Sequence, residues 1–267
     1  MPHADINGHV MYYEVHGQGD PVLCAGGWGT FCHGKERHLP GGLTERYSVI
    51  IFDHRGLGES GDDAAIEAST ALYAGDVAAL LEHLHIERAH MLGIAGIGSC
   101  LGQELAIRRP EMVRSLLLSG TWARADDYFA DQLRLWRRMH REMGFAAFQQ
   151  AIVQASYDPA FYQRYRERLL GPGGGWSELM DNFEAHHRLT EAALGHDSST
   201  RLARVRAPCL VMHAGRDQLT APRLSVPVEQ GIPGAGAWMM EQACHVITDA
   251  RTRQAFSRRI LDFLARH

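Results

Sequence analysis

The sequence predicts an α/β fold, a mostly parallel central sheet with helices on both faces and an inserted helical cap. Short apolar strands alternate with amphipathic helices over residues 1–121 and again over residues 201–267. Residues 122–200 break this rhythm, because they hold several helical stretches and almost no strand pattern. Strands that alternate with helices form right-handed βαβ units and hence a parallel sheet. We therefore expect a core of residues 1–121 and 201–267, with a helical cap over residues 122–200.

The first part of the core starts with short strands and continues as βαβ units. The expected strands cover residues 7–15, 21–25, 47–52, 89–93 and 113–118, and the expected helices cover residues 69–85 and 98–108. Strand 7–15 alternates apolar and polar residues, which is typical of an edge strand, whereas strand 47–52 is apolar throughout and is expected to be buried. In the helix after it, Val77, Leu81 and Leu84 share one face.

The cap is expected to consist of four helices. They cover residues 128–143, 145–155, 159–170 and 176–194, with a glycine-rich break at residues 171–175. The α/β pattern then returns as a strand at 208–213, a helix at 222–230, a strand at 237–240 and a helix at 249–266. A helical block inserted between two strands of one sheet is expected to cover that sheet as a cap.

Composition excludes several classes of protein. The chain has 267 residues, 22% of them charged, and a formal net charge of −4, so it lacks the cationic surface that nucleic-acid binding needs. We find no apolar run of the length that spans a membrane and no secretory signal at the N-terminus, which predicts a cytoplasmic protein. Five cysteines without a CxxC pair do not suggest a disulfide framework; Cys24, Cys100 and Cys209 lie in apolar stretches and are expected to be buried thiols.

Three features that can carry chemistry follow predicted strands. Residues 91–98, Met-Leu-Gly-Ile-Ala-Gly-Ile-Gly, lie where a strand turns sharply into a helix. Gly215-Arg216-Asp217 follows the first strand after the cap, and Cys244-His245 follows the last strand. Open α/β sheets build their sites at the carboxyl ends of parallel strands, so these residues are expected to converge.

This arrangement resembles the α/β-hydrolase superfamily over essentially the whole chain, and most closely its enol-lactonase, esterase and C–C hydrolase branch. Residues 53–60, Asp-His-Arg-Gly-Leu-Gly-Glu-Ser, look like the D-x-R-G-x-G-x-S loop of that family. The turn, acid and histidine also follow in the family's nucleophile–acid–histidine order. The resemblance implies that Asp217 is the acid and His245 the base.

The sequence departs from the family at the nucleophile. The family's turn reads G-x-S-x-G, and the resemblance places Ala95 at the serine position. The alternative register, with Ser99 as nucleophile, sets the bulky Ile97 and Leu101 beside it, where the turn needs small residues. Ser99 and Cys100 are therefore expected to begin the helix and face inward. The N–H of Gly96, with that of Gly27 or Trp28, is expected to form the oxyanion hole.

Three hypotheses account for Ala95. The first is that a serine was replaced by hand, which would silence a hydrolase of esters, lactones or activated C–C bonds that works through a Ser-Asp-His triad. Alternatively, a natural cofactor-free lyase, decarboxylase or oxygenase uses the His245–Asp217 pair as its base. The third hypothesis is a non-catalytic receptor for a small ligand.

Purely structural roles are the alternative for each of these residues. Asp217 alone could close a turn, His245 alone could be one of sixteen histidines, and Asp53, Arg55 and Ser60 are expected to hold their loop rather than touch substrate.

The expected ligand is a small cyclic or aromatic compound. Gly26, Trp28, Trp122 and Arg124 are the expected substrate-binding residues, because they follow strand ends and combine aromatic with cationic character. Neither a metal nor another cofactor is expected: the histidines lack chelating spacing, and the glycines after residue 95 do not match a dinucleotide-binding pattern. No nucleic-acid or membrane partner is expected, and the sequence leaves a homodimer open.

Overall fold

The structure is a computed structural model, and it describes residues 3–28 and 36–267. Cys32, one of the five cysteines, lies outside the described residues. The strands are β1 (His3–Ile6), β2 (His9–His16), β3 (Asp20–Ala25), β4 (Tyr47–Phe52), β5 (Ala89–Ile94), β6 (Val113–Ser119), β7 (Cys209–Ala214) and β8 (Gly236–Met240). The α-helices are α1 (Thr70–His83), α2 (Ile97–Arg108), α3 (Asp127–Met143), α4 (Phe145–Ser156), α5 (Pro159–Leu170), α6 (Phe183–Leu194), α7 (Pro222–Gly231) and α8 (Ala250–Leu264). Short 3-10 turns are η1 (Glu36–His38), η2 (Pro110–Met112), η3 (Ser177–Leu179) and η4 (Leu202–Arg204).

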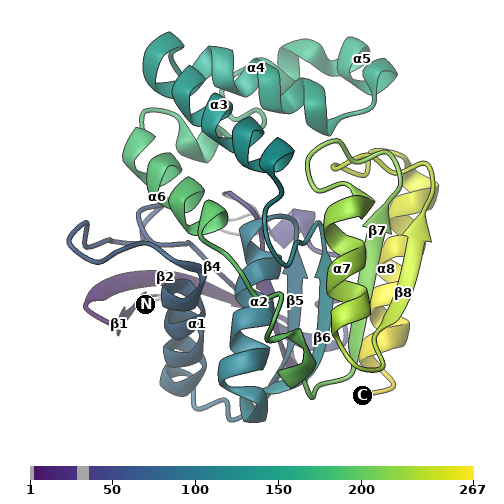
Figure 1. The fold of residues 1–267 in the computed structure, drawn as a ribbon. Coiled ribbons are helices and arrows are strands. Elements are labelled where there is room, and N and C mark those ends of the chain that lie inside the picture. Colours follow the sequence, from purple (N-terminus) through teal and green to yellow (C-terminus); the bar gives the residue numbers. More distant parts are fainter. Residues whose placement is uncertain (1–2, 29–35) are drawn as a thin grey trace.

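One eight-stranded sheet forms the centre of the molecule, in the order β1-β2-β4-β3-β5-β6-β7-β8. From β4 to β8 all neighbouring strands are parallel, whereas β2 runs antiparallel to both β1 and β4. The predicted α/β class with a mostly parallel sheet is confirmed (Figure 1).

The sheet is covered on both faces by apolar side chains of helices. Val77 of α1, Leu101 of α2 and Val228 of α7 belong to the core on one face, together with residues of β3 to β7. The other face packs against α8 through Ile260 and Leu264. Burial of both faces explains why the central strands read as continuous apolar runs.

At two places the local structure differs from the expectation. The single edge strand expected at 7–15 is a hairpin, because Asn7 and Gly8 both take positive φ (47° and 81°) and turn β1 into β2. The fourth cap helix is interrupted, since Trp176 and Asp181 have left-handed φ values of 58°. The α-helix therefore starts only at Phe183, where the Asn182 side chain accepts from the N–H of Ala185.

Helices α3 to α6 lie between β6 and β7 in the chain. Figure 1 shows α3, α4 and α5 at the top of the view, above the sheet, while α6 descends toward α1 and α2. Arg188 of α6 binds the Asp62 carboxylate (2.6 Å), and the Asn182 side chain donates to the Gly56 carbonyl (2.7 Å). These contacts attach the block to the loop that follows β4.

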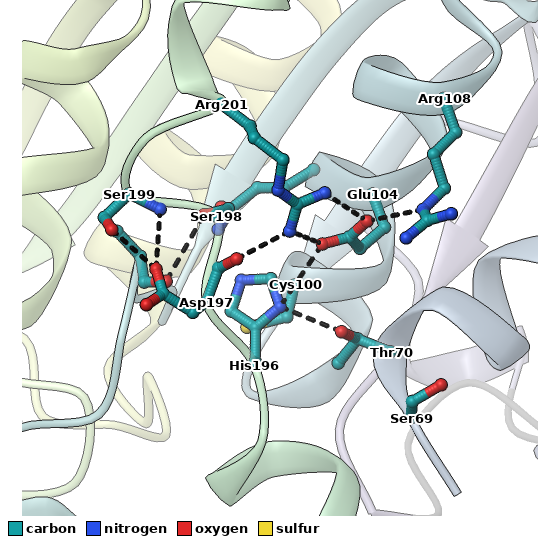
Figure 2. Close-up of polar contacts among 12 residues, drawn as sticks. Ser69, Thr70, Cys100, Glu104, Arg108, His196, Asp197, Ser198, Ser199 and Arg201 are labelled. Carbon is teal, nitrogen blue, oxygen red and sulfur yellow. Dashed lines mark hydrogen bonds and ion pairs between the residues drawn. The ribbon is translucent and has the colours of Figure 1, made fainter. Parts of the chain in front are cut away.

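The chain that leaves α6 is fixed to α2 by a buried polar cluster (Figure 2). Glu104 of α2 accepts from Arg201 (2.5 and 2.9 Å) and from Arg108 (2.8 Å). His196 lies beside it and hydrogen-bonds with Thr70 (2.9 Å). Burial lowers the pKa of His196 to about 4, so this histidine is neutral at pH 7. The cluster holds the end of the helical block against the core.

Candidate active site

A cavity of about 1650 Å³ lies at the carboxyl ends of the parallel strands. Its wall includes Ala95 after β5, Gly120 after β6 and Asp217 after β7. His245 and Trp28 line the same cavity. The structure thus brings together residues from five separate segments, as the strand-end argument predicts.

Asp217 is held by a complete set of hydrogen bonds. Its Oδ1 accepts from the N–H groups of Leu219 (2.7 Å) and Thr220 (3.0 Å). Its Oδ2 accepts from the Thr220 hydroxyl (2.8 Å) and from Nδ1 of His245 (2.9 Å). Burial by itself would raise the pKa of the Asp217 carboxyl, but His245 and these donors hold it below its ordinary value. Asp217 is therefore ionised at neutral pH and has a fixed orientation.

His245 faces Asp217 through Nδ1, which leaves Nε2 as the basic atom. Burial lowers the pKa of the imidazole, but the Asp217 charge and hydrogen bond outweigh burial and raise it above the ordinary value. Two backbone contacts fix the loop that carries His245: Val246 N–H donates to the Ser156 carbonyl (3.0 Å) and Arg216 N–H to the Ala243 carbonyl (2.8 Å). A carboxylate that orients a histidine is the arrangement of a general base.

The turn between β5 and α2 is one residue longer than the family pattern. Gly93 and Gly98 are the two positions where the turn leaves no room for a side chain: a Cβ would lie 2.6 Å from Ser99 Cα at Gly93 and 2.3 Å from the Ala25 carbonyl oxygen at Gly98. Four residues separate these glycines, whereas G-x-S-x-G has three. Ala95 (φ 64°) and Gly96 (φ 60°, ψ −132°) both have positive φ, which is strained for the alanine but freely adopted by the glycine, and α2 begins directly after them. The sharp bend is thus shared by Ala95, which the resemblance places at the serine position, and Gly96.

The Gly96 N–H, which we expect in the oxyanion hole, has a backbone partner in this structure. The Gly96 N–H already donates to the Gly120 carbonyl (2.9 Å) and is not free for a ligand. Ile97, the first residue of α2, provides the next N–H, and first-turn N–H groups have no partner within their helix. Gly27 lies against the turn, since a Cβ on it would be 3.3 Å from the Ala95 carbonyl oxygen. Nε2 of His54 fixes the same segment by hydrogen-bonding with the Gly26 carbonyl (3.0 Å).

Trp122 and Arg124, two expected substrate-binding residues, do not line the described cavity. Trp122 is buried against Phe129, with ring centroids 4.9 Å apart. Arg124 is exposed and its backbone pairs with Asp197. The reason is the path after β6: Gln103 of α2 donates to the Trp122 carbonyl (3.0 Å) and holds this segment alongside α2, away from the strand ends.

Helix α5 supplies the aromatic and cationic surface instead. Tyr157, just before the helix, and Phe161, Tyr165 and Arg168 on it all line the cavity. The Tyr157 and Phe161 rings stack at 5.7 Å, and the Arg168 guanidinium lies 4.5 Å from the Tyr165 ring centroid. The spacing of four residues between Tyr157, Phe161 and Tyr165 is the signal in the sequence that indicates this shared face.

Other predicted residues have structural roles. The Ser99 hydroxyl lies 2.6 Å from the carbonyl oxygens of both Gly93 and Ser119 and donates its one proton to one of them at a time, so it holds the turn closed instead of facing a substrate. Ser60 donates to the Asp53 carbonyl (2.8 Å), and Arg55 pairs with Asp76 (2.5 Å). The four described cysteines are free and buried.

One group among the described residues places three metal-type donor atoms within 4.8 Å of one another. It consists of Glu14, His16 and Glu36, and none of these lines the cavity. Nε2 of His16 already hydrogen-bonds with Glu14 (2.7 Å), so an ion pair accounts for much of this grouping. Over the described ranges, no helix combines the length and the apolar character needed to cross a membrane.

Comparison with known proteins decides the family. The model of the alpha/beta hydrolase fold family matches residues 20–250. The chain is a member of the α/β-hydrolase family. It is 32% identical to "Putative carbamate hydrolase RutD" of Azorhizobium caulinodans, over 98% of each chain. A protein of the same name from Agrobacterium fabrum is 26% identical over 95% of this chain and 98% of its own.

Solved structures of α/β-hydrolases share the fold. The enol-lactonase from Burkholderia xenovorans LB400 superposes with a TM-score of 0.85 at 22% identity, covering 99% of this chain and 100% of its own. A thermophilic esterase from Thermogutta terrifontis gives 0.80 at 20% identity, over 99% and 97%. The expected membership of the α/β-hydrolase superfamily and the expected hydrolase class are therefore confirmed by the family model and the 32% identical relative.

Proposed function

We propose that this α/β-hydrolase cleaves a small carbonyl compound with a water molecule activated by His245, without a covalent acyl-enzyme. The observation that carries the proposal is the combination in one cavity of a fully formed Asp217–His245 pair with a turn that presents Ala95, which has no nucleophilic group, at the serine position. A base without a side-chain nucleophile suits direct attack by water.

In the proposed reaction His245 alone takes up and returns the transferred proton. Nε2 of His245 takes a proton from water while the water oxygen attacks the substrate carbonyl carbon. The resulting oxyanion would accept from the N–H of Ile97 and of Gly27 or Trp28. When the tetrahedral intermediate collapses, the imidazolium returns the proton to the leaving oxygen or nitrogen. Asp217 stabilises the imidazolium between these two steps.

The lengthened turn argues against a hydrolase silenced by a serine-to-alanine change at position 95. In G-x-S-x-G three residues separate the two glycines, and replacing the serine by alanine would not change that number. Four residues separate Gly93 from Gly98 in this chain. The strain at Ala95 is then a native feature of the turn.

Carbamates are the first substrates to test, followed by esters and lactones. The RutD relatives support carbamates by their name and by 32% identity over nearly the whole chain. The α5 wall of the cavity combines aromatic rings with a guanidinium and therefore favours a planar substrate that carries a negative charge; it consists of Tyr157, Phe161, Tyr165 and Arg168. These residues take the substrate-binding role expected of Trp122 and Arg124.

The test compares hydrolysis of aryl carbamates, aryl esters and lactones by the chain and its variants Ala95→Ser, Gly96→Ser and His245→Ala. Position 96 has space for a serine, because only Gly27 Cα lies within 4 Å of a Cβ there (3.7 Å), although the φ of 60° strains any side chain at this position. We expect turnover by the unaltered chain, a loss of about 10²- to 10⁴-fold in His245→Ala, and no large gain from either serine. His83→Ala, at an exposed end of α1, is the control.

Other outcomes point to the remaining hypotheses. A gain of several powers of ten from a serine would contradict direct water attack and indicate a silenced serine hydrolase. Turnover that depends on His245 but adds no water to the product would indicate a lyase or decarboxylase. Tight binding of the compounds with no conversion would indicate a receptor.

A further inference from the structure

Thr220 makes two of the four hydrogen bonds that hold Asp217. Its N–H donates to Oδ1 (3.0 Å) and its hydroxyl to Oδ2 (2.8 Å). Oδ2 is the oxygen that also accepts from Nδ1 of His245 (2.9 Å). The Thr220 side chain is buried, so water does not compete for these bonds.

The same hydroxyl lies close to His245 itself. Its oxygen is 3.3 Å from Nδ1 of His245. An ionised carboxylate only accepts, so the hydroxyl proton points to Asp217 and a lone pair faces the Nδ1 proton. The proton of His245 is thus shared between Asp217, at the shorter distance, and Thr220.

The hydroxyl also lies beside the β5–α2 turn. A Cβ on Gly120 would be 3.0 Å from the Thr220 Oγ1 and 3.1 Å from the Ala95 Cα, so Gly120 is enclosed between the two. The Gly120 carbonyl accepts from the Gly96 N–H (2.9 Å). Thr220 therefore packs where the acid loop meets the strained turn.

We propose that Thr220 is a positioning residue that controls how strongly Asp217 holds the proton-bearing Nδ1 of His245. The proposal deepens the proposed function, in which His245 is the base. By donating to Oδ2, the Thr220 hydroxyl draws negative charge away from the oxygen that stabilises the imidazolium, and it keeps His245 neutral, and hence basic, to lower pH. A purely structural role would be served by the Thr220 N–H, which valine retains.

The direction of the effect follows from the two distances. Removing the hydroxyl deprives Asp217 of a donor at 2.8 Å, which makes the carboxylate a stronger partner for the imidazolium and raises the pKa of His245. It also removes an acceptor 3.3 Å from Nδ1, which lowers that pKa. The shorter, charge-assisted bond outweighs the longer one, so the net change is upward.

The charged side chains around His245 stay the same in a Thr220 variant, so a change in its pKa can be attributed to the hydroxyl. Asp217 is the charged group that acts on the pKa of His245. Arg216 and Asp158 act on the neighbouring Cys244 with opposite signs. None of these three charged side chains changes in a Thr220 variant.

The experiment titrates His245 in the intact chain by NMR with labelled histidine, assigning the signal with His245→Gln. We expect Thr220→Val to move the midpoint to higher pH by about 0.5 to 1, and Thr220→Ser to restore it. The acid limb of kcat/KM should move by the same amount. Thr190→Val is the matched control, because the Thr190 hydroxyl is also buried but has no partner and lies on α6.

A midpoint that stays in place or falls in Thr220→Val would overturn the proposal. If Thr220→Val does not fold, Thr220→Ala provides the same comparison, with the same expected direction. The NMR midpoint does not depend on turnover. Failure of water-based hydrolysis would therefore leave this test intact, and a negative titration would leave hydrolysis intact.

Discussion

The two halves of the cavity differ in how completely they are built for chemistry. In the acid–histidine half, every oxygen of Asp217 has donors between 2.7 and 3.0 Å, and His245 is fixed by the loop contacts around it. In the turn half, Ala95 has a strained positive φ and Gly96 follows it with a second positive φ, but neither carries a reactive side chain. The strain remains although the group it would present is missing.

The difference teaches which part of the machinery this α/β-hydrolase depends on. A buried carboxylate costs free energy unless it is hydrogen-bonded, and the donors around Asp217 offset that cost, so the half that the proposed function uses as its base is also the half that is fully hydrogen-bonded. The turn, in contrast, contributes backbone geometry and N–H groups. Three predictions test this division, in order of decreasing effect.

Asp217→Asn should damage the acid–histidine half most. The amide no longer stabilises the imidazolium, so we expect kcat/KM to fall by about 10²- to 10⁴-fold. Burial then acts on His245 without the opposing charge, so its pKa falls and the acid limb of the pH profile moves to lower pH. The measurement is kcat/KM against pH.

Asp262→Asn is the control for that prediction. Asp262 also lines the cavity, from α8, but it is exposed and has no contact with His245. It should leave both rate and pH limb in place. An acid limb that moved to higher pH in Asp217→Asn would contradict the electrostatic role of Asp217.

Gly98→Ala tests the turn half through stability. Its Cβ would lie 2.3 Å from the Ala25 carbonyl oxygen and 2.5 Å from that of Gly26, and backbone atoms cannot move aside as a side chain can. We expect the free energy of unfolding to fall by about 2 to 3 kcal/mol. Denaturant titration followed by circular dichroism measures it.

Gly102→Ala is the matched change in the same helix. Its Cβ would meet the flexible Met91 side chain at 3.3 Å, and alanine favours helix by up to about 1 kcal/mol over glycine. This variant should be near neutral or more stable. Equal destabilisation by both changes would mean that the close approach at Gly98 is not what constrains the turn.

Ala95→Gly should have the smallest effect and the opposite sign. Glycine adopts a φ of 64° without the cost that alanine incurs, so we expect a gain of about 0.5 to 1 kcal/mol after the added entropy of the unfolded chain. Ala106→Gly, inside α2, should instead lose about 1 kcal/mol. If Ala95→Gly destabilised the protein to the same degree, the strain attributed to Ala95 would not exist.

Much of the core could be predicted because its signals are local. Strand β4 matches the expected residues 47–52, and β5, β6, β7 and β8 match within one residue at each end. Apolar runs bounded by turn residues have one stable environment, the interior of a parallel sheet. The hairpin at Asn7-Gly8 also has a local signal, because Asn-Gly favours the positive φ values of a two-residue turn.

The cavity could be predicted only in part. Asp217 and His245 could be predicted to lie close together because each follows a strand, and strand ends converge by topology. Trp122 also follows a strand, yet Gln103 holds its segment against α2. That contact joins residues nineteen positions apart, and no local pattern announces it.

The sequence by itself determined the fold class, the order of strands and helices along the chain, and the candidate acid–histidine pair. Side-chain periodicity and position after a strand are properties of short segments, so they can be read without the tertiary structure. Only the tertiary structure decided which N–H groups are free, which helix faces the cavity and how the extra residue in the turn is accommodated. Those depend on how closely two backbones approach, as Gly98 approaches Ala25, and that distance is set by the packing of α2 against the whole sheet.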